Sequence, residues 1–293
     1  QLHYGVSGGS FPVWSPDCNW LVFTSGSLLS RDINLRDLHG RTSRNLTVGS
    51  PHDYTPQWSP DGRYLLFGST RDDNGELYRG DMACLRTDPT CPIPLKNLTN
   101  SPAFDTSGAW SPDSTQIAFL SMRTGNEISI HLMDADGGQV RRLIDAPGTE
   151  LGAPQWSPDG TKLAFVTVIG SNNWEIFTLD IATLALNNLT QHPGQDSDPR
   201  WSPDGSKIAF VSRRDNNFEV YIVASTGGTA RNFTNDPSQD LAPAWSPDGR
   251  TIAFHSNRAS SIRNAVYLAD AVDGRPQRLM LSRASLQFPA WCR

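Results

Sequence analysis

Two sets of residues in this sequence have the types and spacing that chemistry requires. The first is Gly5-Val6-Ser7-Gly8-Gly9, a Gly-x-Ser-x-Gly string of the kind that presents a nucleophilic serine in hydrolases. Such a serine needs a strand before it and a helix after it, so that its hydroxyl group stands above an oxyanion hole. Here a strand that ends at Trp14 follows almost at once, and no helical pattern appears. We therefore interpret Ser7 as a loop residue and expect no catalytic site.

The second set pairs acidic with basic residues. In four segments an Asp lies five residues before a Trp and an Arg follows further on, whereas two other segments lack both residues. A ring of carboxylates would suit a cation. However, the Asp and the Arg are present together or absent together in each segment, which favours salt bridges, because the guanidinium fork can hold a carboxylate bidentately. We expect no metal and no cofactor. The pattern leaves open whether each Asp pairs with the Arg of its own repeat or with the Arg of a neighbouring repeat. The pairs are Asp53 and Arg71, Asp105 and Arg123, Asp196 and Arg214, and Asp240 and Arg258.

The elements that must position these residues repeat along the chain. The string Trp-Ser-Pro-Asp occurs six times at intervals of 44 to 52 residues, which is the period of a propeller blade. A Phe lies nine residues after each of these Trp residues, within an apolar segment. The repeats begin near Trp14, Trp58, Trp110, Trp156, Trp201 and Trp245.

Each repeat predicts four strands. The first ends at the Trp, and Ser-Pro-Asp-Gly then makes a tight turn, because Pro presets φ and Gly accepts a positive φ. The second strand carries the Phe, the third carries segments such as Glu219-Val220-Tyr221, and the fourth ends in Asn-Leu-Thr or a variant. A lone blade cannot bury both faces, whereas blades around an axis bury each face against a neighbour. We therefore predict an all-β fold, a six-bladed β-propeller of four-stranded antiparallel blades, forming a single domain over residues 1–293.

One family shares this repeat. Pro-x-Trp-Ser-Pro-Asp-Gly followed by Ile-Ala-Phe-x-Ser, as in Pro243 to Ser256, resembles the WD-like repeat of the TolB-like β-propeller family. The resemblance covers essentially the whole chain. It implies the propeller fold, and it is compatible with periplasmic scaffolds, gating domains of prolyl-oligopeptidase-like proteases and parts of larger sensors.

Composition narrows the classes of partner and compartment. The net charge is −5 with no run of Lys or Arg, so we expect no nucleic-acid partner. No apolar run approaches the roughly 18 residues that span a bilayer, so we expect no transmembrane segment in this chain. An even count of four Cys is compatible with two disulfides and a periplasmic or extracellular location, the alternative being four thiols in a cytosolic protein.

The positions of the four cysteines predict two bridges. Cys84 and Cys91 bracket six residues in the longest repeat, so a disulfide would fasten an insertion. Trp291 has the phase of a seventh repeat, which in a six-bladed ring falls beside the first blade and brings Cys292 near Cys18. The competing interpretation is that the chain ends are accidental overhangs of a longer array and that these two residues lie apart.

These features favour a non-enzymatic, exported protein-binding scaffold of the TolB-like propeller type. The loops from each fourth strand to the next first strand vary most, and they share a face with the loops between second and third strands. We expect a protein or peptide partner on that face, contacting Tyr54, Asp198 and Arg200. The alternative is a gating or substrate-binding propeller module of a larger enzyme, such as a prolyl-oligopeptidase-like protease. A sugar-acting lyase would need His and carboxylate groups converging on the axis.

Overall fold

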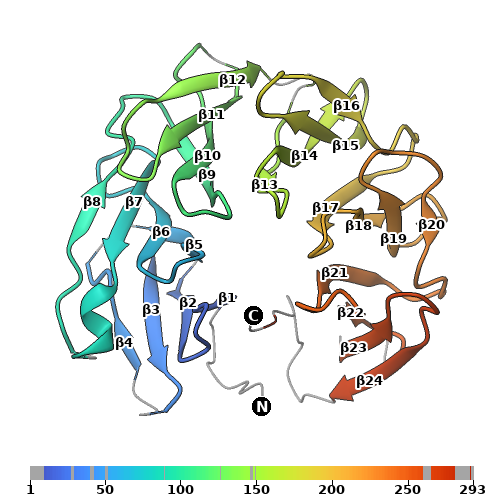
Figure 1. Cartoon of the computed structure of the whole chain (residues 1–293), viewed down its shortest axis with the longest axis horizontal. Coiled ribbons are helices and arrows are strands. Elements are labelled where there is room, and N and C mark those ends of the chain that lie inside the picture. The colour runs from blue at the N-terminus through green and yellow to red at the C-terminus, as the bar shows by residue number, and fades with distance from the viewer. Residues whose placement is uncertain are drawn as a thin grey trace. The chain divides into compact units, whose positions relative to one another are not determined.

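The computed structural model is built of strands in six four-stranded antiparallel sheets, each of which is one blade of the six-bladed β-propeller (Figure 1). The chain divides into two compact units, formed mainly by Gln1–Asn126 with His131–Arg141 and by Glu127–Ile130 with Arg142–Trp291. The structure describes residues 10–27, 30–39, 43–49, 52–88, 90–125, 127–145, 148, 150–259, 265–280 and 291.

In every blade the strands are hydrogen-bonded in sequence order, so each pairs with the strand before and after it. Blade one contains β1 (Ser10–Trp14), β2 (Trp20–Gly26), β3 (Arg31–Asp37) and β4 (Ser43–Asn45). Blade two contains β5 (Asp53–Trp58), β6 (Tyr64–Ser69), β7 (Glu76–Asp81) and β8 (Leu95–Asn97). Blade three contains β9 (Asp105–Trp110), β10 (Gln116–Ser121), β11 (Ser129–Asp134) and β12 (Arg141–Asp145).

The remaining three blades repeat the plan. Blade four contains β13 (Gln155–Trp156), β14 (Lys162–Ile169), β15 (Asn173–Asp180) and β16 (Leu186–Asn188). Blade five contains β17 (Asp196–Trp201), β18 (Lys207–Ser212), β19 (Glu219–Ala224) and β20 (Arg231–Asn232). Blade six contains β21 (Asp240–Trp245), β22 (Thr251–Ser256), β23 (Ala265–Asp270) and β24 (Pro276–Met280).

The Ser-Pro-Asp-Gly turn closes through its own side chains. In blade five, the Ser202 hydroxyl donates to Asp204 Oδ1 (2.6 Å) and accepts the backbone N–H of Lys207 (2.9 Å). Gly205 has φ +71°, and Cys18 takes the same left-handed conformation with φ 64° where blade one has no Gly. Hydrogen bonds from Ser202 and Ser206 lower the pKa of Asp204 to about 2, so the turn is built around an ionised carboxylate.

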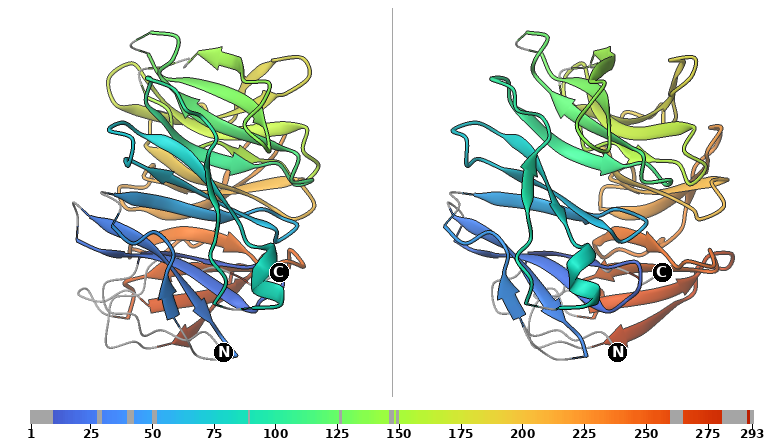
Figure 2. Two further views of the ribbon diagram at one scale, coloured as in Figure 1. Left: turned by 90° about the vertical axis from the view of Figure 1, so that its left-hand side faces the viewer. Right: turned by 60° about the vertical axis from the view of Figure 1, so that its left-hand side comes forward.

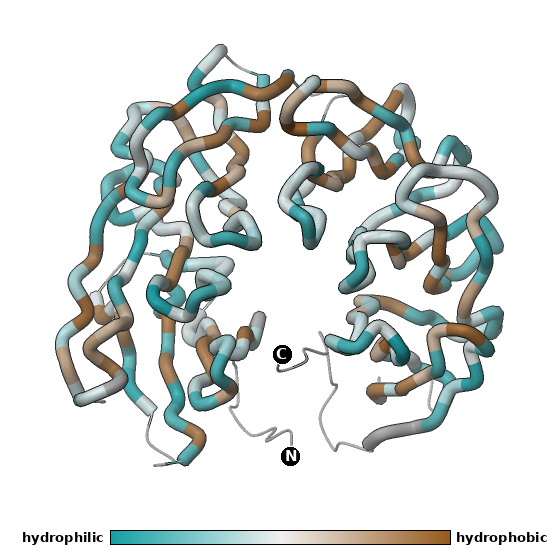
Figure 3. The backbone as a smooth tube through the Cα atoms, in the orientation of Figure 1, coloured by the Kyte–Doolittle hydropathy of each residue, from teal (hydrophilic) through white to brown (hydrophobic). Residues whose placement is uncertain are grey.

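The cores lie between sheets that stack face to face within each unit (Figure 2). The repeated Phe is buried in every blade, and in blades two to six its ring packs against a ring of the third strand at 5.6 to 6.1 Å between centroids. His131 is the partner of Phe119 in blade three and is buried, which makes it a core aromatic. Hydrophobic residues follow the strands, and hydrophilic residues gather at the turns (Figure 3).

In the second unit the repeated Trp also joins neighbouring blades through its indole N–H. The indole N–H of Trp201 donates to the carbonyl of Gln155 (3.2 Å), and that of Trp245 donates to the carbonyl of Arg200 (3.1 Å). Trp291 continues the series by donating to the carbonyl of Ala244 (3.0 Å). Trp291 therefore contacts blade six in the way that Trp245 contacts blade five, and its place beside blade one stays a prediction.

Within the described residues, the one helical segment is the 3-10 turn η1 (Ala83–Arg86) in the connection between β7 and β8. The described part of the chain holds no helix with the length and apolar character that a membrane crossing requires.

Candidate functional site

The structure brings together all four predicted Asp and Arg pairs, each within one blade. The N···O distances are 3.2 Å for Asp53–Arg71, 2.5 Å for Asp105–Arg123, 2.9 Å for Asp196–Arg214 and 2.6 Å for Asp240–Arg258. Each Asp begins the first strand of its blade and is fully buried. Each Arg follows the second strand, and its Nε donates to the Ser that ends that strand, at 2.8 to 3.0 Å. These pairs tie the first strand to the loop between the second and third strands.

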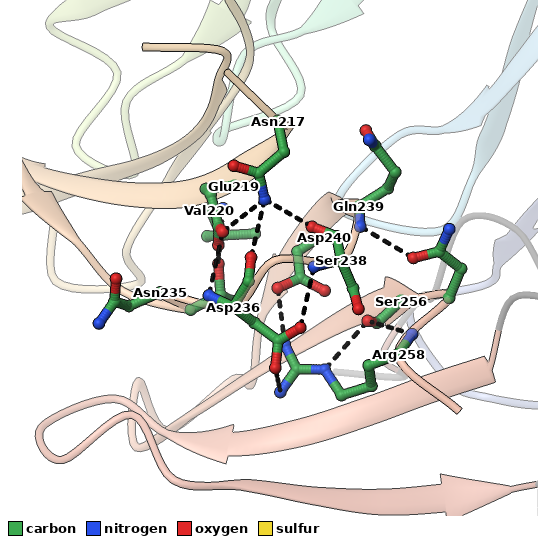
Figure 4. A network of polar contacts seen from close by, with 12 residues as sticks. Asn217, Glu219, Val220, Asn235, Asp236, Ser238, Gln239, Asp240, Ser256 and Arg258 are labelled. Atoms are coloured by element: carbon green, nitrogen blue, oxygen red, sulfur yellow. Dashed lines mark hydrogen bonds and ion pairs between the residues drawn. The ribbon is translucent and has the colours of Figure 1, made fainter. Parts of the chain in front are cut away.

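A second set of buried acids was not anticipated. In blade five the Glu219 carboxylate accepts hydrogen bonds from Asn217 Nδ2 (2.7 Å), the backbone N–H of Asp236 (3.0 Å) and the hydroxyl of Thr234 (Figure 4). Asn217 Nδ2 also donates to the carbonyls of Asp236 and Ser238, both at 2.7 Å. Glu219 and Asn217 therefore hold the loop that leads from blade five to blade six.

The same clamp occurs in two other blades. Glu76 of blade two and Glu175 of blade four accept from the neighbouring Asn and from a backbone N–H of the next loop. The sequence signal is Asn-x-Glu at Asn74, Asn173 and Asn217, and a comparison of the third strands across repeats would have found it. Each of these loops between blades is held by hydrogen bonds to the Asn and Glu of the preceding blade and is followed by the Asp and Arg pair of the next blade.

Burial makes two of these acids unusual. Burial raises the pKa of Asp240 to about 6, with Glu219 adding to the rise while Ser256 and Arg258 oppose it. Burial likewise raises the pKa of Asp196 against the opposing effects of Ser212 and Arg214. Within the described residues, no three His, Cys, Asp or Glu side chains gather to hold a metal ion.

The loop between the second and third strands contains a further acid in blades two and five. Asp72 accepts hydrogen bonds from the Tyr78 hydroxyl and from Asn97 Nδ2 (2.8 Å), and Asp215 does the same with Tyr221 and Asn232 (2.8 Å). Burial, followed by the contact with Asp72, raises the pKa of Tyr78 to about 12. These tyrosines therefore stay protonated and serve as hydrogen-bond donors that shape the loop.

The three residues predicted to contact a partner have different surroundings. Tyr54 is half-buried: it stacks with His52 (5.6 Å between centroids), and a Cβ on Gly68 would lie 2.2 Å from its ring. Asp198 and Arg200 form an ion pair at 3.6 Å with side chains 42% and 37% exposed. Asp198 also lies at a bulge of β17 with φ 54°. Contact with a partner stays a prediction for all three.

One feature of the loops differs from blade to blade on a constant backbone. The residue before the Arg donates its backbone N–H to the carbonyl of the residue before the Asp, at 3.0 to 3.4 Å, in four blades. The two side chains at this position are here called the variable pair. Three of the pairs are polar, whereas Phe104 (43% exposed) and Met122 (36% exposed) form an apolar pair. The variable pairs are His52 and Thr70, Phe104 and Met122, Gln195 and Arg213, and Gln239 and Asn257.

The predicted bridge in the insertion of blade two is present. Cys84 and Cys91 are joined by a disulfide with a Cα–Cα distance of 6.1 Å. Arg44 of β4 donates to the carbonyl of Cys91 (2.6 Å), so the insertion is also tied to blade one. Cys292 and Ser7 lie outside the described residues, so the Cys18–Cys292 bridge and the loop role of Ser7 stay predictions.

Comparisons with known proteins bear on the whole arrangement. A protein of Agrobacterium fabrum, described as uncharacterized, is 30% identical over 142 residues, which are 46% of this chain and 46% of that protein. The uncharacterized peptidase YuxL of Bacillus subtilis is 30% identical over 93 residues, which are 31% of this chain and 14% of that protein. Less than half the length of either curated relative is thus matched.

A solved structure covers more of the chain. A protein of Agrobacterium tumefaciens provisionally assigned to TolB is 26% identical, with a TM-score of 0.65, 87% of this chain covered and 90% of that chain covered. The family model described as TolB beta propeller domain matches residues 126–293, which is more than half of the 293 residues. This chain therefore belongs to the TolB β-propeller domain family.

Proposed function

We propose that this protein is a non-enzymatic, exported scaffold that binds a protein or peptide through the face of the variable pairs. The observation that carries the proposal is the constancy of the backbone beneath changing side chains. Phe104 and Met122, Gln195 and Arg213, and their counterparts sit on the same cross-loop hydrogen bond. Loops of different chemistry on a rigid framework are typical of recognition surfaces.

The acids and bases near this face support binding over catalysis. Asp53, Asp105, Asp196 and Asp240 are each fully buried and paired with Arg, and Glu76, Glu175 and Glu219 are held by Asn and backbone donors. Groups committed to such pairs are not placed to act as a general acid or base on a substrate. The disulfide between Cys84 and Cys91 supports an exported location, because disulfides persist in oxidising compartments.

The alternative is that this chain is the propeller module of a larger enzyme. The match to the peptidase YuxL favours it, although only 14% of that protein is covered. Under this alternative the same face would dock against a hydrolase domain or admit its substrate.

The test uses the partner that co-purifies with the exported protein after crosslinking in the cell. Phe104→Ser with Met122→Ser is expected to weaken the purified complex about tenfold or more, because exposed apolar anchors dominate such interfaces. Ser114→Ala on the opposite turn of the same blade is the control. Equal affinity of both variants, or labelling of the chain by a fluorophosphonate that Ser7→Ala abolishes, would contradict the proposal.

A further inference from the structure

A pocket of about 250 Å³ lies between the first-to-second-strand turns of blades one and two. Trp20 and Trp58 line it together with Met82 and Leu85 of the disulfide-fastened insertion. Asp17 and Asp61, which are both exposed, also line it. The pocket is at the opposite end of the strands from the variable pairs, because β5 runs from Asp53 to Trp58.

The junction of blades two and three, in the same unit, shows which side chains occupy the equivalent position there. There Tyr64 stands where blade one has Trp20, and its ring stacks on Trp110 at 6.1 Å between centroids. The guanidinium of Arg79 lies 4.1 Å from the centroid of the Tyr64 ring, and that of Arg63 lies 4.9 Å from it. Guanidinium groups are attracted to the faces of aromatic rings at such distances. The chain itself therefore supplies two cations at the junction of blades two and three.

Blade one supplies neither. Counted from the repeat Trp, Asn19 stands at the position of Arg63, and by strand register Leu35 stands at the position of Arg79. Leu35 is buried in the core with Val22 and Ile33. No described Arg or Lys lies over the ring of Trp20, which is half-buried at the pocket.

The carboxylates at the pocket could pair with a cation, such as the arginines that blade one lacks. Asp61 Oδ1 accepts the Ser59 hydroxyl (2.5 Å) and the backbone N–H of Arg63 (3.0 Å). Its Oδ2 accepts no hydrogen bond from the described residues, so one carboxylate oxygen is available to a ligand. A guanidinium seated over Trp20 would find both an aromatic face and a carboxylate. Arg63 has this environment at the neighbouring junction, where it lies over Tyr64 and 3.4 Å from Asp81.

We propose that this pocket binds an arginine side chain of the partner. The inference rests on the proposed protein-binding function only for the source of the arginine. The site itself is distinct from the face of the variable pairs, and it can be tested with a small probe. The first probe is N-acetyl-argininamide, and its neutral match is N-acetyl-citrullinamide, which has the same shape without the charge.

The readout is the indole N–H signals of the nine Trp residues in a ¹⁵N NMR spectrum of the whole chain. The arginine probe is expected to shift the Trp20 and Trp58 signals saturably at about millimolar concentration, since a single partly exposed cation site is weak. The citrulline probe is expected to leave them in place. Equal shifts with both probes, or no shift of these two signals with arginine, would overturn the proposal and would leave the variable face untouched.

Two variants sharpen the test. Asp61→Asn is expected to lower the affinity for the arginine probe about threefold or more, whereas Asp248→Asn, in an Asp-Gly-Arg turn of the same hydrogen bonding, leaves it unchanged. Asn19→Arg places a guanidinium where blade two has Arg63, so it is expected to occupy the pocket and exclude the probe, while Asn19→Gln does not. Equal affinity of Asp61→Asn and Asp248→Asn, or full binding by Asn19→Arg, would contradict the assignment.

Discussion

Asp240 shows how one buried residue couples the fold to pH. Its pKa is raised to about 6 by burial, whereas an unfolded aspartate titrates near 3.9. The folded state therefore binds more protons than the unfolded state between about pH 4 and 6. The contribution of Asp240 to the free energy of unfolding is accordingly present below pH 4 and is lost as the pH rises through 6.

Carboxyl ¹³C NMR is expected to show Asp240 titrating with a midpoint near pH 6. Unfolding by urea at several pH values is expected to show that Asp240→Asn removes the corresponding decline in stability. A midpoint below 4, or a pH profile that Asp240→Asn leaves unchanged, would show that Arg258 outweighs burial.

Tyr54 and Gly68 are a second pair whose effect is local. They lie opposite each other in β5 and β6, and a Cβ on Gly68 would lie 2.2 Å from the Tyr54 ring. Blade five has Ser197 opposite Val211 at the same place. Gly68→Val alone is expected to destabilise the protein by about 1 to 3 kcal/mol through overpacking.

Adding Tyr54→Ser to Gly68→Val recreates the pair of blade five and is expected to recover most of that loss. A double-mutant cycle by thermal or urea unfolding measures the coupling. Additive effects of the two changes would show that the ring does not fill the space above Gly68.

At the scale of elements, the loops between blades are held by acids from both sides. Glu219 is 2% exposed and accepts three hydrogen bonds, two of which come from Thr234 and Asp236 in the loop from blade five to blade six. Glu219→Ala is expected to cost about 2 to 4 kcal/mol, because it leaves buried donors unpaired. Asp198→Ala, which breaks an exposed pair, is the control and is expected to change stability by less than about 1 kcal/mol. Equal losses in urea unfolding would argue against the clamp.

The insertion between β7 and β8 depends on its disulfide. Cys84→Ser with Cys91→Ser is expected to lower the free energy of unfolding by roughly 2 to 3 kcal/mol, since the bridge closes a short loop in the unfolded chain. Unfolding in urea with and without reductant measures the loss. A double variant that is as stable as the parent would show that Met82 and Leu85, which pack into the core with Trp58, hold the insertion by themselves.

At the scale of the whole molecule, the repeat predicts most of the fold. Trp, Phe and the Ser-Pro-Asp-Gly turn recur with a fixed spacing, and spacing is what determines strand order and the contacts inside one blade. The Asp and Arg pairs were found in the same way, because both residues are present or absent together. The Asn-x-Glu clamps were missed, although Asn74, Asn173 and Asn217 share the signal, since their partners are mostly backbone groups that have no signature in a sequence.

The pocket at Trp20 could not be predicted for a different physical reason. It depends on how the insertion from Met82 to Cys91 folds back over Trp58, and an insertion has no counterpart in the other repeats. Similarly, the sequence position of Tyr54 predicts an exposed side chain, whereas in the structure its ring lies over Gly68 and is half-buried. The positions of side chains that fill irregular spaces are determined by local packing, which the sequence repeat does not encode.

The proposed function places a protein partner on the face of the variable pairs. A photo-crosslinking amino acid placed at Met122, which is 36% exposed on that face, tests this in the cell that produces the protein. The matched position is Ser114, in the turn at the other end of the same blade. We expect one discrete crosslinked partner from Met122 that is absent from Ser114 and that disappears with Phe104→Ser. A partner captured equally from both positions, or from Ser114 alone, would contradict it.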